Sequence, residues 1–286
     1  MAPSLPSFDL MQRETRISYG PVPRSLGDQN IAEIAWQMAG DRFLLRAAGD
    51  HYFFYSRDEG ITVERGDGAV LEEEELWLNG SVYAAIASMN GLLPIHASAV
   101  AHRSTVVAFT GVPGSGKSTL AAALANFGLP MFCDDTLVLD LSNPDEIVCH
   151  PGHKRLKLSP DAAELTGAEV QERVSPAIDK HYAHPAADVG DRPLPLGSLI
   201  FLEEGPTTKV EPIAGAERML RLDDDHYTAH LFAAAQQFSR GEQFELRARV
   251  ARAISMARFI RPIDRSVFAG GVSLLAEYIS SQPWAR

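Results

Sequence analysis

Short apolar runs separated by turn-forming residues fill the first third of the chain. Residues 42–46, 52–55 and 60–64 are rich in aromatic and branched side chains, and glycine and aspartate lie between them. Runs of this kind, bounded by turn residues, are typical of short β-strands. They predict a small antiparallel, β-rich region over residues 1–90.

The acidic run at residues 72–75 follows these strands and suggests, at first sight, a metal site. Four consecutive carboxylates on a helix cannot share one face, because only residues three or four apart are neighbours there. The helix dipole does favour carboxylates in the first turn of a helix. We therefore interpret the run as the solvated start of a helix that ends at Asn90-Gly91.

In the middle of the chain, longer apolar runs alternate with a helical pattern. Residues 93–101 and 104–110 predict two strands, and the polar turn between them is short enough for a hairpin. The Ala- and Leu-rich segment 120–125 predicts a helix that stops at Gly128, and residues 129–133 predict another buried strand.

The C-terminal half continues this alternation, so that residues 91–286 form a predicted α/β domain. Strands are expected at residues 196–202, 209–213 and 259–262, and helices over 246–253 and 272–279. The first two of these strands should be neighbours. The segment 174–195, which contains four prolines, is the expected mobile loop.

One run in this domain fits the phosphate-binding pattern G-x-x-x-x-G-K-[ST] at every fixed position. It comprises Gly111, Val112, Pro113, Gly114, Ser115, Gly116, Lys117 and Ser118, followed by Thr119 as a second hydroxyl. Glycines let the backbone turn so that several N–H groups converge on phosphate oxygens, and the following helix adds its positive dipole end. In this pattern Lys117 would lie between the β- and γ-phosphates, and the Ser118 hydroxyl would bind Mg²⁺. The run predicts a nucleotide site.

Two adjacent carboxylates, Asp134 and Asp135, follow the strand at residues 129–133. Beside a phosphate loop, one such side chain can orient Mg²⁺ while the other accepts the proton of an attacking hydroxyl. A plain polar turn between two strands is the alternative. His96 lies in the first strand of the predicted hairpin, and a lone histidine in an apolar strand is usually structural. Its place in the same sheet as the loop favours a role in the site.

Composition narrows the functional classes. The net charge of −11 at pH 7 argues against a nucleic-acid surface, because binding a phosphate backbone normally needs a basic face. The two cysteines, Cys133 and Cys149, form neither a disulfide framework nor a zinc cluster. Neither a signal peptide nor a membrane-spanning apolar stretch is evident. We expect a cytoplasmic protein that binds no nucleic acid and no membrane, and a homo-oligomer is left open.

The combination of Ile95-His96-Ala97-Ser98, the loop ending in Lys117-Ser118, and Asp134-Asp135 resembles the catalytic domain of HPr kinase/phosphorylase and its serine-kinase relatives. The spacing matches as well, since His96 lies 21 residues before Lys117 and Asp135 lies 18 after it. The resemblance implies a P-loop kinase domain of the phosphoenolpyruvate-carboxykinase/HPr-kinase type, an α/β fold with a mixed central sheet. It also implies ATP and Mg²⁺ as cofactors and a peptide or protein substrate that carries a serine.

The same resemblance assigns roles to individual residues. Lys117 would bind phosphates, and Ser118 would bind Mg²⁺ with the help of Asp134. Asp135 would be the general base on a serine hydroxyl, and His96 would position or polarise it. The reaction would be in-line transfer of the γ-phosphoryl group.

The chain departs from this family downstream. HPr kinases carry a Glu-x-Arg-Gly-x-Gly signature that supplies a further metal ligand, and the corresponding stretch at residues 150–158 has no such glutamate. In its place is a basic cluster of His153, Lys154, Arg155 and Lys157. The cluster is either a solvated strand edge or a substrate anchor that holds a phosphate or a peptide carboxylate.

This divergent form is similar to the serine kinases that tailor ribosomally made peptides, in particular the lasso-peptide kinases that phosphorylate a precursor's C-terminal serine. On that resemblance the basic cluster would grip the terminal carboxylate. Two alternatives stay open: a P-loop ATPase or nucleotide-dependent switch, and a kinase of a small-molecule alcohol. A switch would need a residue that orients water, whereas Asp135, matched to the family's base, favours an alcohol acceptor.

Overall fold

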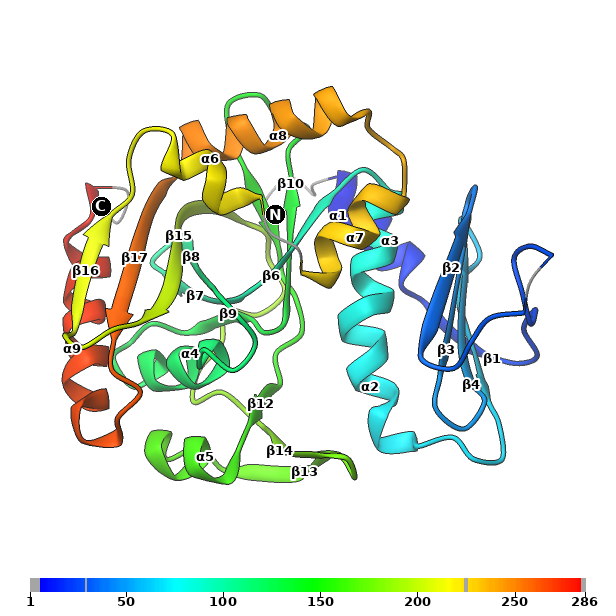
Figure 1. Cartoon of the computed structure of the whole chain (residues 1–286), viewed down its shortest axis with the longest axis horizontal. Helices are drawn as coiled ribbons and strands as arrows, with labels where there is room; N and C mark the ends of the chain where they lie inside the picture. Colours follow the sequence, from blue (N-terminus) through cyan, green and yellow to red (C-terminus); the bar gives the residue numbers. More distant parts are fainter. Residues whose placement is uncertain (1–5, 29, 224–225, 284–286) are drawn as a thin grey trace. The chain divides into compact units, whose positions relative to one another are not determined.

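The computed structural model describes residues 6–28, 30–223 and 226–283, which group into two compact units (Figure 1). Unit 1 comprises Met1–Pro94 and His226–Ser239, and unit 2 comprises Ile95–Asp225 and Arg240–Arg286. The segment 226–239 thus returns to the first unit, which no sequence pattern indicates. Among the described residues, no helix combines the length and the apolar character needed to cross a membrane.

Unit 1 is built on a five-stranded sheet in the order β1-β5-β4-β3-β2. Its strands are β1 (Ile17–Tyr19), β2 (Ala35–Ala39), β3 (Arg42–Ala47), β4 (His51–Ser56) and β5 (Gly60–Arg65). The three interior strands confirm the predicted ones and pair antiparallel. The edge strands are additional. Strand β1, which pairs in parallel with β5, has only three residues, and all three side chains are exposed, so its apolar pattern is too short to predict a strand.

The predicted helix before residue 90 exists, but it is a composite of several helical types. The helices of unit 1 are α1 (Pro6–Glu14), the 3₁₀ helix η1 (Leu71–Glu73), α2 (Glu74–Trp77), the π-helical turn η2 (Leu78–Val82), α3 (Tyr83–Met89) and α7 (Tyr227–Ala234). The interpretation of the acidic run as solvated is wrong for Glu74, which is buried. Its carboxylate accepts hydrogen bonds from Arg65 Nε at 2.7 Å and from the Tyr19 hydroxyl at 2.9 Å, which offset the cost of burying the charge.

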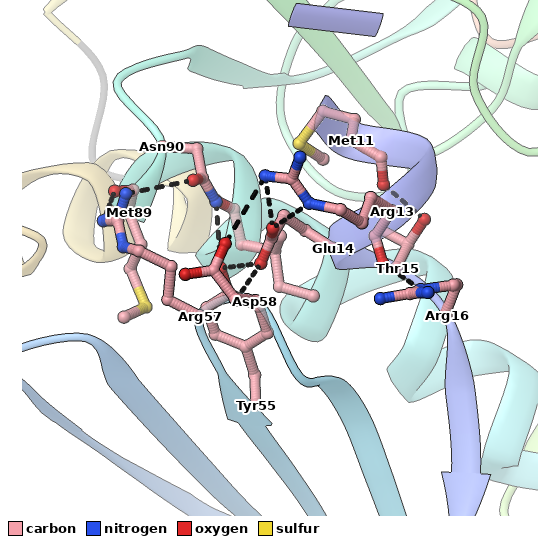
Figure 2. A network of polar contacts seen from close by, with 11 residues as sticks. Met11, Arg13, Glu14, Thr15, Arg16, Tyr55, Arg57, Asp58, Met89 and Asn90 are labelled. Atoms are coloured by element: carbon pink, nitrogen blue, oxygen red, sulfur yellow. Dashed lines mark hydrogen bonds and ion pairs between the residues drawn. The ribbon is translucent and has the colours of Figure 1, made fainter. Parts of the chain in front are cut away.

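A polar network ties α1 to the sheet of unit 1 (Figure 2). The buried Glu14 carboxylate accepts hydrogen bonds of 2.9 Å from the Tyr55 hydroxyl and 2.9 Å from the backbone N–H of Asp58. Arg13 donates to it at 3.0 Å, and Asn90 donates to the Tyr55 hydroxyl at 3.1 Å. Burial alone would raise the pKa of Glu14, but these bonds outweigh burial and hold it below its ordinary value. One ionised carboxylate therefore joins helix, strand and turn.

Unit 2 is built on a nine-stranded sheet in which β6-β10-β11-β15-β8-β7-β9 are successive neighbours, β17 lies beside β15, and β16 lies beside β17. Its strands are β6 (Leu93–His96), β7 (Ser98–His102), β8 (Thr105–Thr110), β9 (Met131–Cys133), β10 (Thr136–Asp140), β11 (Val148–His150), β15 (Leu194–Glu204), β16 (Lys209–Pro212) and β17 (Ser255–Arg261). Strands β8, β15 and β17 run parallel, whereas β7, β9, β11 and β16 are antiparallel to their neighbours. The sheet is mixed, as predicted, and the hairpin of β7 and β8 is confirmed.

Two expectations about strands are wrong. The segment 174–195 is not one loop, because the second sheet of unit 2, ordered β12-β14-β13, takes up part of it. The strands of this sheet are β12 (Leu156–Leu158), β13 (Val170–Ser175) and β14 (Ile178–Ala183). The strand at residues 209–212 pairs with β17 and not, as expected, with β15, because the parallel strand β17 separates them.

The helices of unit 2 are α4 (Lys117–Ala125), α5 (Pro160–Thr166), α6 (Glu217–Leu222), α8 (Arg240–Ala253) and α9 (Arg265–Ser281). Helices α8 and α9 begin earlier than predicted. The side chain of Asp264 caps α9 by accepting the N–H of Ser266. Leu120 and Leu124 of α4 share one buried apolar cluster with side chains of β8, β15 and α9. This core fixes the start of α4, and with it the loop that precedes the helix, to the parallel strands.

Candidate active site

The loop at residues 111–116 connects the carboxyl end of β8 to the start of α4. Three of its glycines have positive φ angles, 151° at Gly111, 84° at Gly114 and 84° at Gly116. At Gly116 a Cβ would also lie 2.8 Å from Nη2 of Arg261, so that the guanidinium would have to shift to accommodate a side chain. Glycine adopts this backbone readily, and the backbone leads the chain directly into a helix N-terminus.

Lys117, the first residue of α4, is buried, and its ammonium lies back on the loop. Nζ donates a hydrogen bond of 2.9 Å to the carbonyl oxygen of Gly111. Burial lowers the pKa of Lys117, and the carboxylates of Asp134 and Asp135 counteract that shift. The lysine and the two aspartates are thus close enough to influence one another's charge.

Asp134 joins three elements of unit 2. Its Oδ1 accepts a hydrogen bond of 2.9 Å from the Ser118 hydroxyl on α4 and one of 2.5 Å from the Ser98 hydroxyl on β7. Its Oδ2 accepts a longer bond of 3.3 Å from the backbone N–H of Lys157. Asp134 is 1% exposed, so these donors replace water almost completely. Sequence reasoning missed Ser98, for which the available signal is a serine in an apolar strand two residues after His96.

Asp135 has different partners from its neighbour. Its Oδ2 lies 2.8 Å from Nζ of Lys157, and its Oδ1 lies 3.8 Å from Nδ1 of His96. Burial alone would raise the pKa of Asp135, but Lys157, assisted by His96 and His153, holds it below its ordinary value. The carboxyl group is therefore ionised at neutral pH and able to accept a proton.

The backbone of Asp135 is also unusual. Its φ angle is 71°, in the left-handed region that few residues other than glycine, asparagine and aspartate adopt. The His96 ring donates from Nδ1 to the Asp135 carbonyl oxygen at 2.9 Å, and the backbone N–H of Ala97 donates to the same oxygen at 3.2 Å. These two bonds hold a strained conformation, and strain of this kind is frequent at functional sites.

The oxygen atoms beside the loop fit a magnesium ion. Mg²⁺ prefers oxygen ligands and is commonly held by one or two protein side chains, with phosphate and water oxygens completing its octahedron. The Ser118 hydroxyl and the Asp134 carboxylate place two oxygens 2.9 Å apart. That separation is close to the roughly 3 Å between adjacent ligands of an octahedral ion whose bonds are about 2.1 Å long.

The four residues of the predicted basic cluster do not form a single patch. Lys154 donates to a backbone oxygen of β9, and Arg155 forms an ion pair with Glu172. His153 lies edge-on to an aromatic ring of β14. Lys157, in contrast, turns toward the aspartate pair. The structure thus brings Lys157 together with Asp134 and Asp135, while Lys154 and Arg155 have partners of their own.

A large cavity of about 880 Å³ lies away from these residues, near the amino ends of β8, β15 and β17. Arg218, Phe244 and Arg252 line part of it, and no carboxylate does so in the part of the chain that the structure describes. A smaller cavity of about 230 Å³ touches the loop itself. Because the titratable groups converge at the loop, we place the candidate site there and not at the larger cavity.

No protein-family model matches the chain, and no curated protein does. Among solved structures, the chain is similar to the HPr(Ser) kinase/phosphatase from Coxiella burnetii, with a TM-score of 0.32 and 15% identity over 65% of this chain and 95% of that one.

Proposed function

We propose that the chain is an ATP-dependent kinase that uses Mg²⁺ and transfers the γ-phosphoryl group to a serine hydroxyl of a peptide or protein. One observation carries the proposal: two adjacent aspartates beside the loop have different partners. Asp134 meets the Ser118 hydroxyl at 2.9 Å, and Asp135 meets the Lys157 ammonium at 2.8 Å. This is the division expected between a metal-binding carboxylate and a general base.

The loop would hold the phosphates of ATP. Its N–H groups and the start of α4 attract anions. Lys117 donates to the Gly111 oxygen, and with ATP bound it would exchange this oxygen for phosphate oxygens. Ser118 and Asp134 would hold Mg²⁺, which when bound neutralises charge on the β- and γ-phosphates.

Asp135 would act as the general base. The serine oxygen forms a bond to the γ-phosphorus while the bond from that phosphorus to the leaving ADP oxygen breaks. The hydroxyl proton passes to a carboxylate oxygen of Asp135. His96 is a positioning residue, because its ring holds the Asp135 backbone and approaches the carboxylate only at 3.8 Å.

On the sequence resemblance, we propose that the domain is a P-loop kinase domain of the phosphoenolpyruvate-carboxykinase/HPr-kinase type. On the same resemblance, the acceptor would be the C-terminal serine of a lasso-peptide precursor. Since Lys157 is engaged with Asp135 and Lys154 with a backbone oxygen of β9, the peptide's carboxylate would bind at Arg155. Arg155 can exchange its partner Glu172, whose side chain is 58% exposed, for a peptide carboxylate.

The test is phosphate transfer from γ-labelled ATP, with Mg²⁺, to serine peptides that have a free or an amidated C-terminus. We expect transfer to free C-termini and none to the matched peptides in which alanine replaces the serine. Arg155→Gln should raise the KM for the free peptide and leave the KM for ATP unchanged. Equal use of both peptide forms would refute the carboxylate site. Hydrolysis of ATP without transfer to any peptide would favour the switch instead.

A further inference from the structure

The cavity of about 230 Å³ beside the loop has no role in the chemistry described so far. Gly116 and Thr119 form its wall on the loop side, and Leu165 of α5 and Phe268 of α9 form the opposite side. None of Asp134, Asp135 and His96 lines it. Its residues all belong to unit 2, so that one compact body builds both the loop and the cavity.

A buried cation lies where the cavity meets the loop. Arg261, the last residue of β17, is 7% exposed, and its Nη2 donates to the Ser115 carbonyl oxygen at 2.7 Å. Burial lowers the pKa of Arg261, although an arginine stays protonated in proteins. Arg261 makes no ion pair with any residue that the structure describes. A guanidinium whose hydrogen bond goes to a backbone oxygen, and not to a carboxylate, keeps its positive charge available for an anionic ligand next to the loop.

The rest of the wall combines apolar and polar side chains. Leu165, Pro262, Ile263 and Phe268 contribute hydrocarbon surface, and Ile263 is 63% exposed although it is a large hydrophobic residue. The charged side chains on the wall, besides Arg261, are Asp161, Asp264 and Arg265. Ligand pockets usually combine such walls with a few polar groups that fix orientation. The cavity is smaller than the pockets that enclose a whole drug-sized ligand, and it would suit one portion of a ligand whose phosphates lie on the loop.

We propose that this cavity binds the nucleoside portion of the donor nucleotide, with Arg261 on the phosphates nearest the nucleoside. The inference rests on the proposed function and on in-line transfer, in which the attacking and leaving oxygens lie on opposite sides of the phosphorus. The acceptor approaches from Asp135, so the leaving nucleoside diphosphate lies away from Asp135. The cavity is lined by loop residues but by neither Asp134 nor Asp135, so its position agrees with a leaving group that lies away from Asp135.

The experiment compares two ligands by calorimetry in the presence of Mg²⁺: ATP, and inorganic tripolyphosphate, which has the phosphates but no nucleoside. Leu165→Trp fills the cavity, and Val267→Trp places the same side chain on α9 at a residue that does not line it. We expect Leu165→Trp to weaken ATP binding at least tenfold and to change tripolyphosphate binding less than twofold. The control should alter neither.

A second variant with a smaller change in side-chain volume tests the same site in case Leu165→Trp does not fold. Ile263→Ala removes part of the exposed wall, and should weaken ATP about fivefold without affecting tripolyphosphate. Equal affinity of the wild type for both ligands, or parallel weakening of both in the variants, would overturn the nucleoside site while leaving phosphate binding intact. Absence of binding of either ligand to the wild type would instead overturn the proposed function, and the nucleoside site with it.

Discussion

The ion pair between Lys157 and Asp135 yields the sharpest quantitative test of the site. Lys157→Met keeps the length and the apolar stem of the side chain but removes the ammonium 2.8 Å from Oδ2 of Asp135. The two side chains are only 11% and 18% exposed, so water cannot replace the lost partner fully. Removing one partner of a buried pair typically costs 3 kcal/mol or more, and we expect about 3 kcal/mol of unfolding free energy to be lost here.

Asp135→Asn is the second single variant of a double-mutant cycle with Lys157→Met. Asparagine tolerates the left-handed backbone at φ 71°, so this change removes the charge without adding backbone strain. In the double variant neither charge is left unpaired. It should therefore lose about 2 kcal/mol less than the sum of the single variants.

The measurement is urea-induced unfolding followed by circular dichroism at pH 7, with m values compared across the four proteins. Lys209→Met and Glu211→Gln form a matched control cycle, because this pair is equally close at 2.7 Å but exposed at 48% and 39%. Exposed pairs contribute little, so the control should show almost no coupling. Additive effects of Lys157→Met and Asp135→Asn would refute the assignment of Lys157 as the partner that keeps Asp135 ionised.

Three further predictions concern individual contacts. Gly116→Ala places a Cβ 2.8 Å from Arg261 at a positive φ, and titration calorimetry should show at least tenfold weaker ATP binding; unchanged affinity would contradict the tight loop geometry. Ser98→Ala removes the 2.5 Å bond to Asp134 and should lower the unfolding free energy by about 2 kcal/mol, whereas unaltered stability would show that the bond is not needed. His150 is buried with its pKa lowered to about 4 by burial, so the unfolded chain, in which histidine titrates near 6.5, binds the proton first as the pH falls. The titration of His150 should therefore lower the free energy of unfolding by about 2 kcal/mol between pH 7 and pH 5. Urea titrations at both pH values should show a decrease smaller by this amount in His150→Gln.

Local sequence suffices to predict the loop and its flanking strand and helix. The glycines, Lys117 and Ser118 lie within eight positions of one another, so a strand–loop–helix pattern fixes their arrangement almost alone. The proximity of Asp134 follows from the next buried strand. The mixed sheet could be expected from the family resemblance and the hairpin, because a two-residue turn between β7 and β8 requires antiparallel pairing.

The remaining contacts depend on distant parts of the chain. Lys157 reaches Asp135 because β12 joins a separate small sheet, and Ser98 reaches Asp134 because β7 pairs with β9. Arg261 meets the loop through the parallel registration of β17 with β15. Hydrophobic periodicity specifies none of these registers, and the return of residues 226–239 to unit 1 is equally invisible to it.

The central claim is that Asp135 accepts the proton of a serine hydroxyl at a loop that binds ATP. The most direct measurement follows phosphoserine formation by mass spectrometry under single-turnover conditions, with ATP affinity measured in parallel, for the wild type and Asp135→Asn. Loss of a general base typically slows a reaction by about 10²- to 10⁴-fold, and we predict a decrease of that size with ATP affinity changed less than threefold. Undiminished phosphoserine formation in the variant would contradict the account, as would a wild type that binds ATP but phosphorylates no serine.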